Sequence, residues 1–252
     1  MSQLLEVTDL RVTYGNVVAV NDVSLSVAQG EVVGLIGPNG AGKSSFIDAL
    51  TGYHPSRGGH VTFEGSSLDG RPAHDVARRG LVRTFQSVEL FDDLTVEENL
   101  LVAAEHPTIW SALRDLVVPS RPQGVDDVAW ARGLCDLDAV AHRYPRELSH
   151  GQRKLVGVAR ALAQRPRLVL MDEPAAGLDT DESVTFGARV RSLPGHGVSV
   201  LLVDHDMGLV LGVCDRIVVI DFGSVIASGT PDQIRADPRV IEAYLGSHDA
   251  HA

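Results

Sequence analysis

The sequence predicts an α/β protein with a largely parallel sheet and an inserted helical segment. Short apolar runs that are typical of buried strands occur at residues 32–36, 168–171, 199–203 and 217–220, and helical segments lie between them. Such alternation of strands with helices favours a parallel sheet. Residues 88–147 contain no comparable apolar run and show a helical pattern broken by prolines. We therefore expect a helical subdomain inserted into an α/β core.

The expected domain organisation follows from these segments. We place the helical subdomain at residues 88–149 and the α/β core at residues 1–87 and 150–252. A chain of 252 residues suits one domain with a subdomain. Hydrophobic residues make up 44% and charged residues 22%, which is typical of a globular protein and excludes a disordered one. Alternating apolar residues at 5–10 and 17–27 predict two N-terminal strands.

Charge and cysteine content restrict the functional class. The net charge of −11 argues against a broad basic face, so we expect no nucleic-acid partner. Cys135 and Cys214 form no CxxC pair, and we expect a reducing compartment without a disulfide framework. The N-terminus lacks the pattern of a signal peptide, and the most apolar region, residues 198–220, is interrupted by charges. We expect a cytoplasmic protein that docks on membrane partners.

A phosphate-binding loop is predicted directly after the strand at residues 32–36. Residues 37–44 match G-x-x-x-x-G-K-[ST], and a helix follows. The glycines let several backbone N–H groups face one phosphate, and the helix N-terminus favours the same anion. Lys43 would reach the β- and γ-phosphates, and Ser44 would ligate Mg²⁺. The predicted nucleotide-binding residues of this loop are Gly37, Pro38, Asn39, Gly40, Ala41, Gly42, Lys43, Ser44 and Ser45.

Two carboxylates follow the second buried strand, in the segment LVLMDEP. The carboxyl ends of strands are where ligands collect in open α/β sheets. Asp172 would hold Mg²⁺, partly through water, and Glu173 would orient and polarise an attacking water. An acidic turn after a strand is common on its own. Together with the phosphate loop, the pair predicts nucleotide hydrolysis.

The third motif is LSHGQRK at residues 148–154, directly before a helix. LSHGQ resembles the LSGGQ signature, and with the two preceding motifs the chain resembles the transporter-type ATP-binding cassette ATPases. The resemblance implies a P-loop NTPase core of the RecA-like kind, an N-terminal antiparallel β subdomain and an inserted α-helical subdomain that carries the signature. It also implies ATP and Mg²⁺ as cofactors and ATP hydrolysis as the activity.

The resemblance assigns further roles to single residues. Ser149, Gly151 and Gln152 would contact the γ-phosphate of ATP bound to an opposite subunit, although His150 departs from the second glycine of the signature. A helix N-terminus with a hydroxyl is physically suited to an anion. The remaining assignments are Tyr14 stacking on adenine, Gln86 sensing Mg²⁺ and water, Asp179 coupling two subunits, and His205 contacting the γ-phosphate. Asp204 stands before His205 where a glutamate is more usual, and we expect little consequence from it.

The resemblance extends from about residue 4 to residue 246, and within the family it is to the branched-chain amino acid importer ATPases. The segments that resemble these ATPases are residues 82–104, the long insert that follows them and precedes the signature, and residues 205–246. Urea and amide importers have ATPases of very similar pattern, so the solute stays open. The implied partners are a second ATPase subunit, homomeric or heteromeric, transmembrane permease subunits at the cytoplasmic face of the membrane, and indirectly a solute-binding protein.

The insert has two interpretations. Its apolar residues at helical spacing are Ile109, Trp110, Leu113, Leu116 and Val117. They favour an amphipathic helix that covers the subdomain, and the alternative is a surface that contacts the membrane subunit. Residues 88–100 are the better docking candidate, because the family places its coupling groove beside the Gln86 loop. The C-terminal residues 240–245 predict a helix packed on the core.

Two other functional classes share part of this motif set. A soluble, non-transport cassette protein that acts on nucleic acid or ribosomes would share the ATP motifs. Such proteins usually carry two cassettes or a long coiled-coil insertion, and this chain predicts neither. A P-loop kinase would leave LSHGQ and the position of His205 unexplained. The sequence therefore favours the motor subunit of an importer.

Overall fold

The computed structural model describes residues 2–54, 58–85, 89–104 and 124–245. It divides into two compact units, residues 1–86 with 167–252 and residues 87–166. The first unit is built from strands and helices, and the described part of the second is helical. The predicted α/β class is confirmed.

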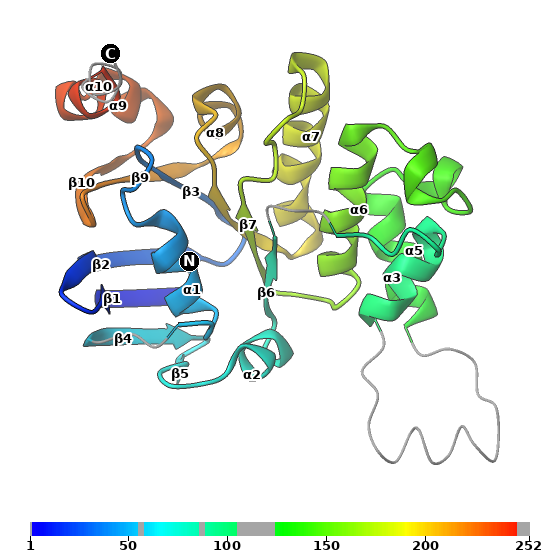
Figure 1. Cartoon of the computed structure of the whole chain (residues 1–252), viewed down its shortest axis with the longest axis horizontal. Helices are drawn as coiled ribbons and strands as arrows, with labels where there is room; N and C mark the ends of the chain where they lie inside the picture. Colours follow the sequence, from blue (N-terminus) through cyan, green and yellow to red (C-terminus); the bar gives the residue numbers. More distant parts are fainter. Residues whose placement is uncertain (1, 55–57, 86–88, 105–123, 246–252) are drawn as a thin grey trace. The chain divides into compact units, whose positions relative to one another are not determined.

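The first unit contains an antiparallel sheet of the order β2-β1-β4-β5, assembled from N-terminal strands (Figure 1). Its strands are β1 (Gln3–Tyr14), β2 (Val17–Ala28), β4 (Gly58–Phe63) and β5 (Ser66–Ser67). Alternate side chains of β1 and β2 are buried, as period-two patterning requires of a sheet with one covered face. The two predicted N-terminal strands are therefore present and longer than the patterned segments.

The second sheet of this unit has the order β10-β9-β3-β8-β7-β6. Its strands are β3 (Val32–Ile36), β6 (Leu81–Thr84), β7 (Leu168–Asp172), β8 (Ser199–Val203), β9 (Arg216–Asp221) and β10 (Ser224–Gly229). All its neighbouring pairs are parallel except β9 with β10. Since β3, β8 and β7 are adjacent, the loops at their carboxyl ends meet at one edge. This topology brings the phosphate loop, Asp172 and Asp204 into one region.

Helix α1 (Lys43–Leu50) lies between the two sheets and packs on β1, β2 and β7 (Figure 1). Its buried Phe46, Ile47 and Leu50 join an aliphatic core that includes Val33 and Leu35 of β3. The intervening Gly34 faces the other side of β3, where a Cβ would lie 2.9 Å from the side chain of Val210 and 3.0 Å from that of Cys214. Helix α8 (Met207–Val213) therefore covers the face of β3 opposite to α1.

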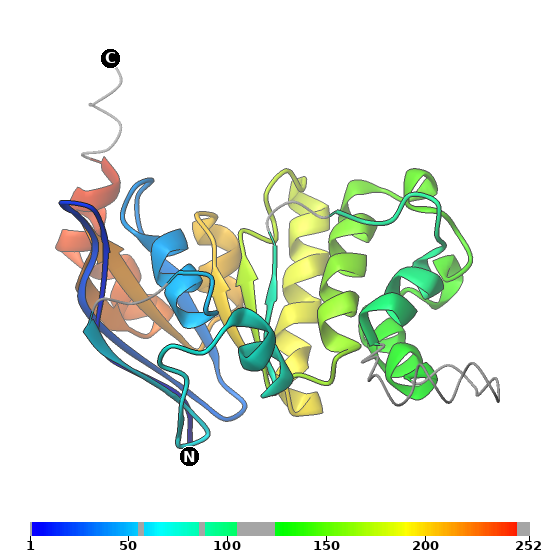
Figure 2. The ribbon, with the colours of Figure 1, turned by 60° about the horizontal axis from the view of Figure 1, so that its bottom comes forward.

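The remaining elements of the first unit are short helices and the longer α7. They are α2 (Ala73–Arg78), α7 (Thr180–Ser192), the 3₁₀ helix η3 (Leu193–His196), α9 (Pro231–Ala236) and α10 (Pro238–Leu245). Figure 2 shows α9 and α10 at the C-terminal end of this unit, beside β10. The expected C-terminal helix is thus present, and its Val240 is buried.

The second unit is a group of packed helices. It contains α3 (Val96–Ala104), α5 (Val125–Leu134), α6 (His150–Leu162) and the 3₁₀ helices η1 (Asp138–Val140) and η2 (Pro145–Glu147). Helices α3, α5 and α6 contact one another (Figures 1 and 2). The expected boundary at residues 149 and 150 differs from the observed one, because α6 buries its apolar face against α3 and α5 and so belongs to this unit. The apolar insert at residues 109–117 lies outside the described residues.

No described helix of the chain has the length and apolar content needed to cross a membrane.

Candidate active site

The loop between β3 and α1 has a backbone that only glycine permits at two positions. Gly42, the residue before α1, has a φ of +99°, and a Cβ there would lie 2.1 Å from the carbonyl oxygen of Ala19. At Gly37 a Cβ would lie 2.0 Å from the carbonyl oxygen of Ile220. The loop is therefore pressed against its neighbouring strands, which sets the direction of α1 and of its N-terminal N–H groups.

Lys43 begins α1 and is largely buried. Its Nζ donates hydrogen bonds to the carbonyl oxygens of Gly37, at 2.7 Å, and Pro38, at 2.9 Å. Burial lowers the pKa of Lys43, and the negative charges of Glu173, Asp172 and Asp204 oppose that shift. An ammonium group thus lies within the field of three carboxylates, at the start of the helix that follows the phosphate loop.

Asp172 is the last residue of β7 and Glu173 follows it, so both lie at the carboxyl end of a buried strand, as predicted. The backbone N–H of Glu173 donates to the carbonyl oxygen of Val203, at 2.7 Å, which ties this turn to β8. Glu173 has a φ of +43°, an uncommon conformation for a residue with a side chain. The side chain of Glu173 is about one-fifth exposed, whereas that of Asp172 is mostly buried and accepts a hydrogen bond from Arg83.

Asp204 is the buried centre of the loop that follows β8. Its Oδ1 accepts the backbone N–H groups of His205, at 2.8 Å, and Asp206, at 3.0 Å, and its Oδ2 accepts the N–H of Ala175, at 3.3 Å. Asp204 therefore joins the backbone after β8 to the turn that carries Glu173. Little consequence was expected from an aspartate at position 204, but these contacts show that its side chain organises the two loops that carry Glu173 and His205.

The half-exposed His205 ring lies beside both carboxylates. Its Nδ1 is 3.7 Å from Oε1 of Glu173 and 3.7 Å from Oδ1 of Asp204. In this arrangement a carboxylate is able to orient a water molecule, and the neighbouring histidine is able to donate a hydrogen bond to a phosphate oxygen.

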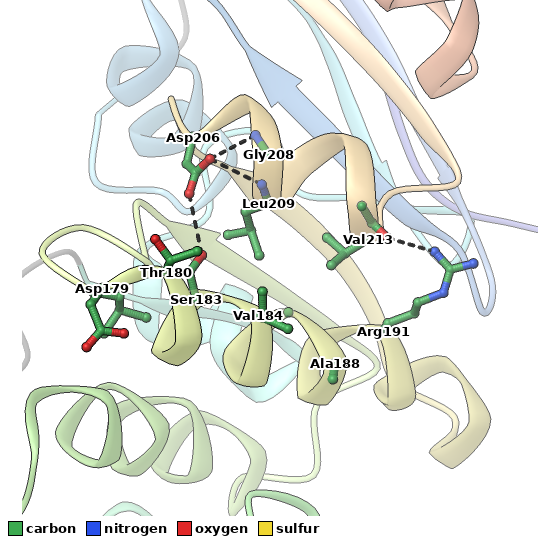
Figure 3. Close-up of a pocket in the computed structure, with 13 residues that line it drawn as sticks. Asp179, Thr180, Ser183, Val184, Ala188, Arg191, Asp206, Gly208, Leu209 and Val213 are labelled. Carbon is green, nitrogen blue, oxygen red and sulfur yellow. Dashed lines mark hydrogen bonds between the residues drawn. The ribbon is translucent and has the colours of Figure 1, made fainter.

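Asp179 lies at the N-terminus of α7, where its Oδ1 accepts the N–H of Glu182 at 2.8 Å. Figure 3 shows how α7 and α8 face each other. Ser183 of α7 donates a hydrogen bond to Asp206, which also caps α8 by accepting the N–H groups of Gly208 and Leu209. A hollow of about 530 Å³ lies between the two helices. The α7 helix is thus connected to the residue after His205.

Other predicted residues lie at the surface of the first unit. Asn39, Gly40 and Ser44 are exposed in the phosphate loop and the first turn of α1. Tyr14, at the end of β1, is also exposed, and its ring centroid is 4.4 Å from that of His54. Tyr14 therefore contacts the His54 ring. Among the described residues, no contact joins it to the phosphate loop.

The signature residues lie in the helical unit at the start of α6. Ser149 caps this helix: its Oγ accepts the N–H of Gln152 at 3.2 Å, and the Gln152 Oε1 accepts the N–H of Ser149 at 3.0 Å. In this capping box Ser149 and His150 are exposed, while Gly151 is buried. An exposed helix N-terminus with a hydroxyl suits an anionic ligand.

The structure therefore brings together Lys43, Asp172, Glu173 and His205 from separate segments of the first unit. Gln86 lies outside the described residues. Sequence reasoning did not find Arg83, whose only signal is a charged residue in a short, otherwise largely apolar strand. Ser183 and Asp206 were not predicted either, because the hydrogen bond between them joins residues 23 positions apart in the chain.

Comparison with known proteins places this geometry in a family. The family described as "ABC transporter" matches residues 20–176, and a second, described as "Branched-chain amino acid ATP-binding cassette transporter", matches residues 224–250. The chain belongs to the ABC transporter ATPases. As a member of this family it binds ATP and is an ATPase.

This ABC ATPase has full-length relatives. It is 42% identical to the high-affinity branched-chain amino acid transport ATP-binding protein BraF of Pseudomonas aeruginosa, over 96% of this chain and 98% of that protein. It is 41% identical to LivG of Escherichia coli, with the same description, over 98% and 99% of the two chains. A solved ABC transporter cassette in its ADP conformation is 31% identical, with a TM-score of 0.87 and coverage of 98% and 100%.

Proposed function

We propose that this ABC ATPase is the motor subunit of an importer for branched-chain amino acids and that it drives transport by ATP-dependent dimerisation. The observation that carries the catalytic part is the convergence of Lys43, Asp172, Glu173 and His205 at the carboxyl edge of the sheet. The names of the relatives and the match at residues 224–250 support the solute class.

In the proposed reaction, the chain positions the phosphates and one water. The backbone N–H groups of residues 40–45 and the Lys43 ammonium would bind the β- and γ-phosphates. Lys43 would exchange its present carbonyl acceptors, Gly37 and Pro38, for phosphate oxygens. Glu173 would accept a hydrogen bond from the attacking water, and His205 would donate one to a γ-phosphate oxygen. The 3.7 Å separation of Glu173 and His205 supports a shared action on one reacting centre.

The donor set fits Mg²⁺. Ser44 would offer a hydroxyl and Asp172 a carboxylate, and the described residues contain no group of three His, Cys, Asp or Glu that would hold a metal unaided. Such a set suits a metal shared with substrate phosphates, since Mg²⁺ commonly binds one or two protein oxygens, phosphates and waters. Gln86 is proposed as a further ligand. Bound Mg²⁺ would neutralise charge on the phosphates.

The proposed dimer completes each site from the other subunit. Ser149, Gly151 and Gln152 would contact the γ-phosphate held by the opposite phosphate loop, and Asp179 would couple the two subunits. Tyr14, whose side chain is exposed beside His54, would stack on adenine. Closure of the dimer is then a ligand-driven shift between two conformations, with ATP binding the closed one more tightly.

The proposed partners are a second ABC ATPase, which is a copy of this chain or a paralogue, and transmembrane permease subunits at the cytoplasmic face of the membrane. Residues 88–100 are the proposed docking segment, of which residues 89–100 are described and include the start of α3. A solute-binding protein would act through the permease. The division of helical and α/β units at residues 87–166 is consistent with a separate docking module.

Uptake of labelled leucine, isoleucine and valine tests this function. Cells that lack the chain are complemented with the wild type or with Glu173→Gln. We expect uptake to be lost in the deletion and restored by the wild type alone. Uptake of the three amino acids that is unchanged by the deletion would overturn the solute assignment, and labelled urea and amides would then be tested. If purified wild-type protein also failed to hydrolyse ATP, the motor function itself would be wrong.

A further inference from the structure

Arg83 joins two carboxylates of the first unit, one of which is the proposed metal ligand. Its Nη2 donates to Oδ2 of Asp172 at 2.8 Å, and its Nη1 donates to Oδ1 of Asp48 at 2.5 Å. Arg83 lies in β6, Asp172 ends the neighbouring strand β7, and Asp48 lies in α1. One guanidinium thus connects the helix that follows the phosphate loop to the carboxylate at the end of β7.

The Arg83 guanidinium is largely shielded from water, which strengthens its interactions with charged groups. The side chains of Arg83 and Asp172 are only 10% and 11% exposed. The rings of Tyr53 and Phe85 lie over the guanidinium, with centroids 5.7 and 5.2 Å from Cζ, and form an edge-to-face pair. Partial desolvation and ring contact hold the guanidinium in one orientation, because it has little access to competing water.

We infer that Arg83 is a positioning residue for the metal ion: it fixes the Asp172 carboxylate through Oδ2 and leaves Oδ1 to the metal, while Asp48 neutralises its charge. This inference rests on the proposed role of Asp172. Within the described residues, Oδ1 of Asp172 forms no hydrogen bond. A carboxylate held by one oxygen loses less rotational freedom when its other oxygen binds a cation.

Asp48 has a different role from Arg83, because it neutralises the arginine charge. An arginine next to a metal ligand would by itself repel a divalent cation. Its 2.5 Å pair with Asp48 makes the Arg83–Asp48 pair neutral overall, so that Asp172 keeps its full negative charge toward the metal. Positioning by Arg83 and neutralisation by Asp48 are therefore separable by substitution.

The test measures metal affinity without turnover. Mn²⁺ replaces Mg²⁺ in an electron paramagnetic resonance titration of the full-length protein saturated with a non-hydrolysable ATP analogue. Fluorescence of a labelled analogue in excess EDTA gives the metal-free nucleotide affinity. For Arg83→Met we expect Mn²⁺ binding about tenfold weaker, as for other residues that orient metal ligands, and an unchanged metal-free affinity. Asp48→Asn is expected to weaken Mn²⁺ severalfold by leaving Arg83 unneutralised.

Matched controls separate the possible outcomes. Arg216→Met removes another partly buried arginine, which is the first residue of β9 and pairs with Glu31 at 2.9 Å. This control should leave Mn²⁺ affinity unchanged. Asp172→Asn tests the proposed ligand: if it leaves Mn²⁺ affinity unchanged, the proposed role of Asp172 is wrong. If Asp172→Asn weakens Mn²⁺ while Arg83→Met and Asp48→Asn leave it unchanged or tighten it, the inference about Arg83 is overturned. Arg83→Met should add nothing in the Asp172→Asn background.

Discussion

Nδ1 of His205 lies 3.7 Å from Oε1 of Glu173, although the two residues follow different strands of the parallel sheet. Asp204 maintains this approach, because its carboxylate binds the backbone of His205 on one side and that of Ala175, two residues after Glu173, on the other. The approach of Glu173 and His205 is therefore supported by a buried carboxylate that accepts hydrogen bonds from the backbone of both loops.

Glu173→Gln should retain ATP binding and lose turnover. Glutamine keeps the size and the hydrogen-bonding ability of the side chain but is too weak a base to polarise water. We expect the rate of phosphate release to fall by at least about 100-fold, the usual lower bound for loss of a general base. Equilibrium binding of labelled ATP should stay within about twofold. Full ATPase activity in this variant would remove Glu173 from the proposed catalytic role.

Ser149→Arg should block ATP-dependent dimerisation. The substitution puts bulk and charge at the exposed N-terminus of α6, where the γ-phosphate of the partner subunit is proposed to bind. Size-exclusion chromatography with ATP, in the Glu173→Gln background, is the measurement. Ser66→Arg introduces the same side chain at an exposed position of β5 and should dimerise normally. Equal dimer yields for both variants would contradict the proposed interface.

Asp206→Ala should reduce both stability and turnover. It removes the cap of α8 and the partner of Ser183, next to His205. We expect the free energy of unfolding in urea to fall by about 1 kcal/mol and kcat to fall as well. Thr230→Ala removes a comparable cap from α9 and is the matched control. It should cost similar stability without lowering kcat, and an equal loss of kcat in both variants would show that only stability matters.

Gly42→Ala should abolish nucleotide binding. At a φ of +99°, with 2.1 Å between a Cβ and the Ala19 carbonyl oxygen, the loop must rearrange to admit a methyl group. Gly133→Ala is the contrasting change, since this helical position has open space around it. There we expect a gain of about 0.5–1 kcal/mol in the free energy of unfolding and unchanged ATP affinity. Normal ATP affinity in Gly42→Ala would show that the loop tolerates rearrangement.

Cys214 should make stability fall at alkaline pH. Burial raises the pKa of this thiol from 9.0 to about 12. Between those values the unfolded chain releases the proton while the folded one retains it. The free energy of unfolding therefore decreases as pH rises above about 9, by up to about 1.4 kcal/mol per pH unit from this group. Urea unfolding at pH 8.0, 9.0 and 10.0 checks this. Cys214→Val should have a shallower pH slope, and identical slopes would contradict the assignment.

Several parts of the fold were predictable from local pattern. The apolar runs became β3, β7, β8 and β9. The strand β6 was not predicted, because Arg83 interrupts its short apolar segment. This strand is supported by its parallel pairing with β7, which lies far along the chain. The boundary expected at residues 149 and 150 differs from the observed one because the helix after residue 149 was placed in the core, whereas the apolar face of α6 packs with α3 and α5.

The sequence by itself determined the α/β class and the positions of the phosphate loop, the paired carboxylates and the LSHGQ segment, because each depends on a short spacing or on one strand–loop–helix junction. Tertiary structure alone decided the hydrogen bonds of Arg83 to Asp48 and Asp172, the role of Asp204, and the unit to which α6 belongs. The partners of Arg83 lie 35 and 89 residues away in the chain. No local pattern specifies such pairs, since they form only when strand order and helix packing bring distant side chains to one edge of the sheet.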